Sequence, residues 1–346
     1  MENEPAILTF RERRGKAAGR AADRERRARG RGKHRPRRNR LPTIRTLAEL
    51  LEKARAAGPC TIVVPAAESE TALAAAVEAR RRGLAESIFI GDRDGIADRL
   101  WKLEEDPSRH AIVHEPDDDA AAREAVARVR SGEARLILKG RLGTGALLRA
   151  VLDRDLGLRA GRLLSDVVVT EHPDPEAPRL LGITDGGVNV APGLAEKKAI
   201  LENAVRVFHR LGFERPVVAC LCAVETPSEA MPHTLDARAL AEMADRGEIA
   251  GCAVVGPLAL DNALYPWAAR AKGIAHPLAG RADVLLCSTL EVGNALAKAF
   301  TYLANKPVAH VVEGARAPVL IPSRVERAED KLFSIALGVL AAREGP

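Results

Sequence analysis

From about residue 42 onward, stretches with the apolar spacing of helices alternate with short apolar runs typical of strands. Residues 46–57 have apolar side chains at helical spacing, and Thr46 is placed to cap that helix. After Gly58-Pro59, the β-branched run 60–65 predicts a strand covered on both faces, as in parallel sheets. Helical and strand patterns then alternate to the end of the chain, which predicts an α/β fold with a mostly parallel sheet.

The other predicted elements repeat these two patterns. Short apolar runs predict strands at 87–90, 134–139, 167–170, 180–184, 217–224, 252–255, 284–287 and 308–312. Helical periodicity predicts helices at 68–82, 144–152, 191–211, 235–246, 260–272, 292–303 and 323–342. In open α/β sheets ligands bind beyond the carboxyl ends of the strands, so the loops after these strands are candidates for a site.

Charge is distributed unevenly along the chain. Residues 1–40 carry 15 Lys or Arg and 5 Asp or Glu, whereas residues 41–346 carry 38 and 42. Residues 11–40 offer only alanines for burial, which predicts a disordered basic tail. Such a tail can attach to nucleic acid by neutralising phosphates, but it lacks the aromatic residues that stack on bases. A start codon farther downstream is another explanation of the tail.

Several locations and partners find no support in the sequence. No stretch approaches the roughly 18–20 apolar residues of a membrane helix, and no apolar core of a secretory signal begins the chain. Neither a His-rich motif nor a C-x-x-C pair indicates zinc. We therefore expect a cytoplasmic protein without membrane contact, whose cysteines are free thiols, namely Cys60, Cys220, Cys222, Cys252 and Cys287.

Three local motifs are each open to two interpretations. Residues 140–145 follow a predicted strand and open a helix, so their amides either cradle a phosphate or form a plain turn. Asp185-Gly-Gly-Val-Asn189 either orients a ligand or is an ordinary turn. Ser323-Arg-Val-Glu326 has the pattern of a helix-capping box, and the same geometry with an Arg suits a phosphate or an oxyanion. The nearby Glu329-Asp330 is either a source of a base or a solvated face.

Taken in order, a set of segments resembles the phosphate acetyltransferase/phosphate butyryltransferase family, most closely the butyryl branch, from about residue 41 to 342. The matching segments are Ala66-Ala-Glu-Ser-Glu70, Leu138-Lys-Gly140 with Thr144, Gly161-Arg-Leu-Leu-Ser165, Thr184-Asp-Gly-Gly-Val-Asn-Val-Ala-Pro192, Ala223-Val-Glu225, Met231-Pro232 with Thr234 and Asp236, Gly256-Pro-Leu-Ala-Leu-Asp-Asn-Ala263, Ala279-Gly-Arg-Ala-Asp283, Glu291-Val-Gly-Asn294 with Lys298, Ala317-Pro318 and Ser323-Arg324.

The resemblance implies a fold, an activity and partners. The fold is the two-domain α/β arrangement of isocitrate and isopropylmalate dehydrogenases, with mostly parallel sheets and an interdomain cleft. Domain I comprises residues 41–165 and 289–346, and domain II comprises 166–288. The implied reaction is reversible transfer of a short acyl group between coenzyme A and inorganic phosphate. Coenzyme A and phosphate are substrates, no metal or nicotinamide cofactor is implied, and the chain is expected to form a homodimer or a larger oligomer.

The resemblance also implies roles for single residues. Ser323 hydrogen-bonds the phosphoryl leaving group, Arg324 pairs with phosphate or developing charge, and Asp330 is the base, with Glu326 and Glu329 as rivals for that role. The implied substrate-binding residues are Lys139, Gly140, Thr144, Ser165, Asp185, Asn189, Asp261, Glu291, Asn294 and Lys298. One departure is Asp166, where the butyryl branch usually has His, and it puts the acyl preference in doubt.

Two other functions remain as alternatives. A metal- and NAD-dependent dehydrogenase of the same fold requires clustered aspartates, but Asp236, Asp261 and Asp283 lie in separate segments. A nucleic-acid-binding or regulatory protein with a degenerate acyltransferase body requires binding that survives deletion of residues 1–40. The intact Ser323, Arg324 and Asp330 argue against a degenerate enzyme.

Overall fold

The computed structural model describes residues 43–176 and 178–343. The predicted tail, 1–40, therefore lies outside the described residues. Within them, the strands form one sheet in the order β3-β2-β1-β4-β11-β10-β5-β6-β9-β7-β8. The strands are β1 (Cys60–Pro65), β2 (Ala85–Gly91), β3 (Ala111–His114), β4 (Leu136–Leu138), β5 (Ser165–Glu171), β6 (Leu180–Thr184), β7 (Val217–Leu221), β8 (Ala253–Leu258), β9 (Val284–Leu286), β10 (Val308–Glu313) and β11 (Val319–Leu320).

The sheet consists of two parallel blocks that run in opposite directions. Strands β3, β2, β1, β4 and β11 are parallel to one another, and so are β6, β9, β7 and β8. The central strands β10 and β5 are antiparallel to each other, and each is antiparallel to the block it adjoins. The predicted α/β fold with a mostly parallel sheet is confirmed. One sheet runs through both parts of the predicted domain division, and that division stays a prediction.

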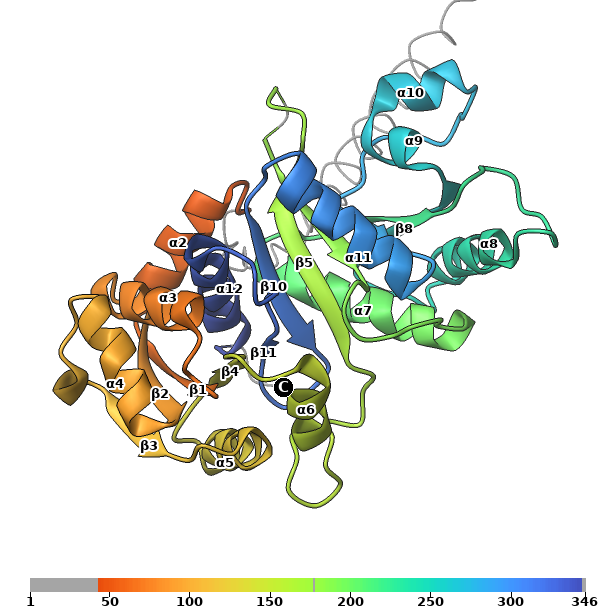
Figure 1. Cartoon of the computed structure of the whole chain (residues 1–346). Coiled ribbons are helices and arrows are strands. Elements are labelled where there is room, and N and C mark those ends of the chain that lie inside the picture. Colours follow the sequence, from red (N-terminus) through yellow and green to blue (C-terminus); the bar gives the residue numbers. More distant parts are fainter. Residues whose placement is uncertain (1–42, 177, 344–346) are drawn as a thin grey trace, which may run out of the picture. The chain divides into compact units, whose positions relative to one another are not determined.

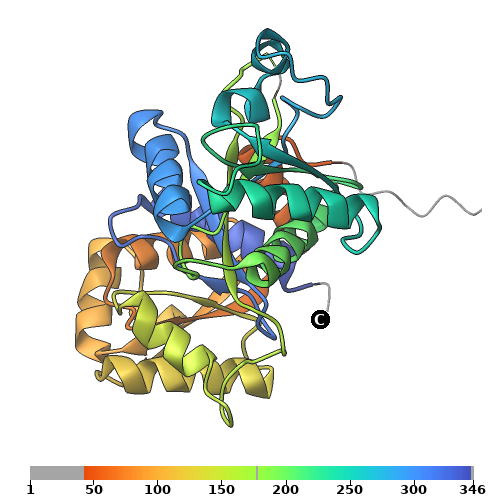
Figure 2. The same cartoon turned by 90° about the vertical axis from the view of Figure 1, so that its right-hand side faces the viewer.

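Helices cover both faces of this sheet (Figures 1 and 2). The helices are α2 (Leu47–Ala56), α3 (Glu70–Arg81), α4 (Arg93–Lys102), α5 (Asp118–Ser131), α6 (Thr144–Val151), α7 (Leu194–Arg210), α8 (Pro232–Asp245), α9 (Leu260–Leu264), α10 (Pro266–Ala271), α11 (Leu290–Lys298) and α12 (Ala328–Ala341), with a 3₁₀ turn η1 (Pro107–Arg109) and a π-helical turn η2 (Ala299–Leu303) that continues α11.

Alternating strand residues supply a core to each face. Helices α2, α3, α4, α7, α8 and α12 share one core with Ile62 and Val64 of β1, whereas Val63 faces α5 and α6 on the other side. A third cluster lies under α9, α10, α11 and η2. Figure 2 shows α11 (blue) and α7 (green) on opposite sides of the central strands. Apolar side chains thus line both faces of the strands, as the strand-like runs in the sequence predict.

Local sequence explains where the elements begin and end. Thr46 caps α2 by accepting a 3.1 Å hydrogen bond from the Glu49 amide, as predicted. The helix predicted at 260–272 is split into α9 and α10, because Pro266 lacks the amide hydrogen that a continuous helix needs and its ring crowds the preceding turn.

No helix within the described ranges 43–176 and 178–343 is long and apolar enough to cross a membrane.

Candidate active site

A cavity of about 220 Å³ lies where the two parallel blocks meet the central strands. We call it the Ser323 cavity. It is lined by residues from the start of α6, β5, the β6–α7 loop, α11, η2, β10 and the β11–α12 loop, namely Thr144, Asp166, Val168, Gly186, Gly187, Asn294, Ala297, Lys298, Thr301, His310, Ile321, Ser323 and Glu326.

Strand register brings two ionisable side chains of this cavity together. In the antiparallel β10–β5 ladder, His310 pairs with Val168 and Val312 pairs with Asp166. Because strand side chains alternate, these four residues project from one face of the sheet. His310 and Asp166 therefore meet diagonally, with His310 Nδ1 3.2 Å from Asp166 Oδ2.

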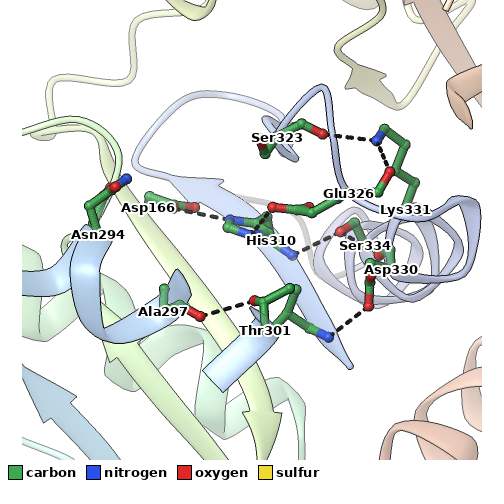
Figure 3. A network of polar contacts seen from close by, with 12 residues as sticks. Asp166, Asn294, Ala297, Thr301, His310, Ser323, Glu326, Asp330, Lys331 and Ser334 are labelled. Atoms are coloured by element: carbon green, nitrogen blue, oxygen red, sulfur yellow. Dashed lines mark hydrogen bonds and ion pairs between the residues drawn. The ribbon is translucent and has the colours of Figure 1, made fainter. Parts of the chain in front are cut away.

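His310 lies between two carboxylates (Figure 3). Its Nε2 atom is 3.3 Å from Glu326 Oε1, while its backbone amide donates to Ser334 Oγ at 2.9 Å. Burial by itself lowers the pKa of His310, but the charges of Asp166 and Glu326 outweigh burial and raise the pKa to about 10. Burial raises the pKa of Glu326, and the charge and hydrogen bond of His310 bring it below its ordinary value. The three side chains form a charged cluster with an imidazolium at its centre.

One oxygen of each carboxylate in this cluster is unpaired among the described residues. Asp166 Oδ1 and Glu326 Oε2 are buried and have no hydrogen-bond partner there. An unsatisfied buried acceptor costs about 1–3 kcal/mol, so a proton or a donor supplied by a substrate would be stabilised at either oxygen.

The segment from Ser323 to Glu326 forms a turn, and the predicted capping box is wrong. The Glu326 amide donates to the Ser323 carbonyl at 3.2 Å, and helix α12 begins only at Ala328. The buried ammonium of Lys331 donates to the carbonyls of Ser323 and Glu326, at 2.9 and 2.8 Å. Lys331 thus fixes the turn from within the first helical turn of α12, and the turn presents Ser323 and Glu326 to one cavity.

The other predicted catalytic residues lie outside the cavity lining. Asp330 is completely buried, and its oxygens accept from the Val308 amide at 3.1 Å and from Arg327 at 3.0 and 3.2 Å. Arg324 and Glu329 are exposed. Arg324 still influences Lys139, because burial, followed by the charges of Lys331 and Arg324, lowers the pKa of Lys139 to about 8.

Three of the predicted binding residues reach the Ser323 cavity. They are Thr144, Asn294 and Lys298. Asn294 Nδ2 donates to the Gly186 carbonyl at 2.9 Å, which ties α11 to the loop after β6. That loop approaches α11 so closely that a Cβ on Gly293 would lie 2.1 Å from the Asp185 carbonyl oxygen. Gly140 similarly allows the loop after β4 to pack on the Ala66 carbonyl, where a Cβ would be 2.1 Å away.

Three other predicted binding residues hold the chain itself. Asp185 Oδ1 and Oδ2 accept from the backbone amides of residues 187–189, at 2.8 to 3.0 Å. Asn189 Nδ2 donates to the Leu164 carbonyl at 2.8 Å, and buried Ser165 accepts from Asn203 at 2.8 Å. Burial and the neighbouring Asp166 raise the pKa of Asp185. These contacts shape the loops around the cavity, and roles in substrate binding remain predictions.

The last two predicted residues lie at the surface. Asp261 in α9 accepts a 3.0 Å hydrogen bond from Lys272, which directly follows α10. Glu291 is exposed in the first turn of α11. Within the described part of the chain, no group of three His, Cys, Asp or Glu side chains is arranged to hold a metal ion.

Among the ionisable residues that line the cavity in the described part of the chain, His310 is the one that the sequence did not predict. Its signal was an ionisable residue inside the apolar run of residues 308–312 in β10, whereas Asp166 directly precedes the valine run of residues 167–169 in β5. Their partnership depends on β10 pairing antiparallel with β5 in a register that periodicity does not reveal.

Comparison with known proteins identifies the family. A family model described as phosphate acetyl/butaryl transferase matches residues 109–339. The chain is 40% identical to a phosphate butyryltransferase of Clostridium acetobutylicum over 86% of this chain and 99% of that protein. It is 39% identical to a phosphate acetyltransferase of Rhizobium meliloti, over 85% and 92%.

Solved structures agree with these relatives. A branched-chain phosphotransacylase from Enterococcus faecalis superposes with a TM-score of 0.71 at 29% identity, covering 82% of this chain and 99% of that one. A 4-hydroxythreonine-4-phosphate dehydrogenase from Klebsiella pneumoniae shares the fold, with a TM-score of 0.50 at 13% identity over 82% and 100%. The predicted dehydrogenase-like fold and the predicted enzyme class are both confirmed. The chain belongs to the phosphate acetyl/butyryl transferase family.

Proposed function

We propose that the Ser323 cavity is where this protein exchanges a short acyl group between coenzyme A and inorganic phosphate. The observation that most supports this site is that Ser323, Glu326 and His310 line one cavity, together with Lys298. Acyl transfer in either direction passes through a tetrahedral oxyanion and involves a proton. The cavity offers groups that stabilise an oxyanion and groups that take up a proton. Its apolar walls at Val168, Ala297 and Ile321 suit a short alkyl chain.

Positive charge near the cavity suits the two anionic substrates. Lys298 lines the cavity, and Lys331 and Arg324 lie close enough to Lys139 for their charges to lower its pKa. We assign Ser323 and Thr144 to hydrogen bonds with the phosphoryl oxygens, because a hydroxyl donates well to a charged oxygen. Arg324 is exposed and follows Ser323 directly, so we assign it to a bound phosphate, since its planar fork suits two oxygens.

The proton passes to the charged cluster. When acyl phosphate reacts with coenzyme A, the thiol sulfur attacks the acyl carbon and its proton goes to Glu326. The bond between the acyl carbon and the phosphate oxygen then breaks, and its electron pair leaves with phosphate. Two carboxylates and one imidazolium carry a net charge of −1, so the cluster becomes neutral on accepting one proton. Because the three groups are coupled, that proton belongs to the cluster as a whole.

Glu326 is a better candidate for the base than Asp330. Glu326 lines the cavity and has one unpaired oxygen, whereas both oxygens of Asp330 already accept hydrogen bonds in the interior. The low pKa of Glu326 limits its strength as a base. It also makes protonated Glu326 a good acid for returning the proton to the thiolate in the reverse direction.

Glutamine at 326 tests this assignment. Glu326→Gln should lower kcat about 10²–10⁴-fold, in a coupled assay of acyl phosphate with coenzyme A. Asp330→Asn should change stability more than kcat, and the exposed Glu329→Gln serves as the matched control. Folding of each variant is checked by circular dichroism. If Asp330→Asn abolishes turnover in a folded protein while Glu326→Gln retains it, the assignment is wrong.

Three further properties complete the proposal. We propose that the enzyme needs no metal or nicotinamide cofactor, and that it assembles as a homodimer or a larger homo-oligomer, which light scattering would measure. We also propose a cytoplasmic location, because all five cysteines are free thiols, a state that a reducing compartment maintains.

A further inference from the structure

A second cavity, of about 410 Å³, is lined by five arginines. We call it the arginine pocket, and its basic side chains are Arg130, Arg135, Arg162, Arg210 and Arg316. Glu313 is the single acidic residue among its described lining residues. The lining therefore carries a charge of about +4 when all six groups are ionised.

The arginine pocket is separate from the Ser323 cavity. It lies where β4 and β11 begin, beside Arg135 and Pro318, and at the end of α12, beside Ala342. The Ser323 cavity lies where β11 ends and α12 begins. The two cavities share no lining residue. A ligand in the arginine pocket therefore would not occupy the acyl-transfer site.

The single carboxylate of the arginine pocket is already paired. Glu313 is buried and accepts from Arg210 at 2.7 and 3.4 Å, and Arg206 lies 3.9 Å from it. Three arginines donate instead to backbone carbonyls: Arg130 to Asp155 at 2.7 Å, Arg135 to Ala342 at 2.8 Å and Arg316 to Arg159 at 2.9 Å. Each of these contacts uses one of five N–H groups, so most donors of the lining stay available.

Arg162 shows most clearly that a partner is missing. Its Nε atom is buried and has no hydrogen-bond partner among the described residues. Arg162 also acts on its neighbour Arg206, whose pKa is lowered first by burial and then by the charge of Arg162. Guanidinium groups that repel one another are stabilised by a shared anion, and their planar forks match phosphate oxygens.

We propose that the arginine pocket binds one small polyanion per chain, carrying two or more linked phosphate groups. The lining charge of about +4 is balanced by a ligand of three or four negative charges, which a single phosphate does not supply. A volume of about 410 Å³ falls within the range of about 300–1,000 Å³ typical of small-molecule pockets. A nucleoside triphosphate and an inorganic polyphosphate share this chemistry.

Calorimetric titration of the full chain with inorganic tripolyphosphate, and separately with ATP, tests the proposal at one fixed ionic strength. The test variant is Arg135→Gln with Arg162→Gln, because neither residue pairs with Glu313 and Arg210 remains to neutralise it. One control is the exposed Arg238→Gln on α8, which lies outside both cavities. A second is Arg324→Gln, which reports binding at the Ser323 cavity.

The wild type should bind one polyanion per chain, and the double variant should bind at least about tenfold more weakly, while both controls bind like the wild type. Equal affinity for the two ligands would show that the phosphate chain is recognised, and tighter binding of ATP would add a contact to the nucleoside. The basic residues of 1–40 are the same in all variants, so any polyanion bound by them does not account for a difference between variants. Absence of wild-type binding, or undiminished binding by the folded double variant, overturns the proposal.

Discussion

Replacing His310 by Gln removes the positive charge that lies between two carboxylates. The imidazolium contacts Asp166 Oδ2 at 3.2 Å and Glu326 Oε1 at 3.3 Å, and the side chains of Asp166 and Glu326 are 3% and 7% exposed. Without His310, these carboxylates repel each other in a poorly solvated space. Breaking a buried charge pair by removing one partner costs about 3–5 kcal/mol.

The pKa of His310 gives a second measure of the same effect. It rises from the ordinary 6.5 to about 10, and each pH unit in that interval corresponds to about 1.36 kcal/mol, or about 5 kcal/mol in all. Because the folded pKa is above the unfolded one, this stabilisation is complete below pH 6.5 and disappears as the pH rises through about 10. The free-energy difference between wild type and His310→Gln should therefore be largest near pH 6.5 and small near pH 10.

Urea unfolding of both proteins at pH 6.5, 8 and 9.5 measures this difference. Taking the difference between the two proteins cancels the contributions of other groups that titrate in this range to the free energy of unfolding. His209→Gln is the control, since His209 contacts a carbonyl oxygen of Gly251 at 2.8 Å and no carboxylate in the described residues. A destabilisation by His310→Gln that stays constant from pH 6.5 to 9.5 would refute the assignment of an imidazolium between two carboxylates.

Two substitutions near the cavity give further predictions. Gly293→Ala should lower the free energy of unfolding by about 1–3 kcal/mol, because the added Cβ would lie 2.1 Å from the Asp185 carbonyl oxygen; thermal melting checks this, and an unchanged melting temperature would contradict it. Lys139→Met should stabilise the fold at pH 7, because burial lowers the pKa of Lys139 to about 8. The stability gained by Lys139→Met should shrink as the pH rises from about 8 to 10.5, the ordinary pKa of lysine. Urea unfolding across that range measures it, and a constant gain would contradict the prediction.

Much of the fold follows from local patterns in the sequence. The strands Cys60–Pro65 and Leu180–Thr184 have the predicted bounds, because short, mostly apolar runs between turn residues are typical of buried strands. Helices α4 and α5 were not predicted. Helix α4 buries only Ile96 and Leu100, and α5 buries three alanines and one valine. Both helices carry many charged residues. Weak amphipathicity left their periodicity without a clear signal.

The site was predictable only in part, since its geometry depends on distant contacts. Ser323 and Glu326 were singled out from sequence, but as the start of a helix. The turn that they form is held by Lys331, whose burial no local pattern announces. The cluster with His310 requires β10 and β5, which are 144 residues apart at His310 and Asp166, to pair in one register. Loop closure over such distances is decided by tertiary packing rather than by local propensity.

The most direct test of the central claim is release of free thiol from acyl-coenzyme A with and without inorganic phosphate. Acetyl-, propionyl-, butyryl- and longer acyl-coenzyme A are compared for the wild type, Ser323→Ala and Glu326→Gln. We predict phosphate-dependent release by the wild type with at least one short acyl group, and a large loss of kcat in both variants. A folded wild type that releases no thiol in a phosphate-dependent way, or variants that keep full turnover, would contradict acyl transfer at the Ser323 cavity.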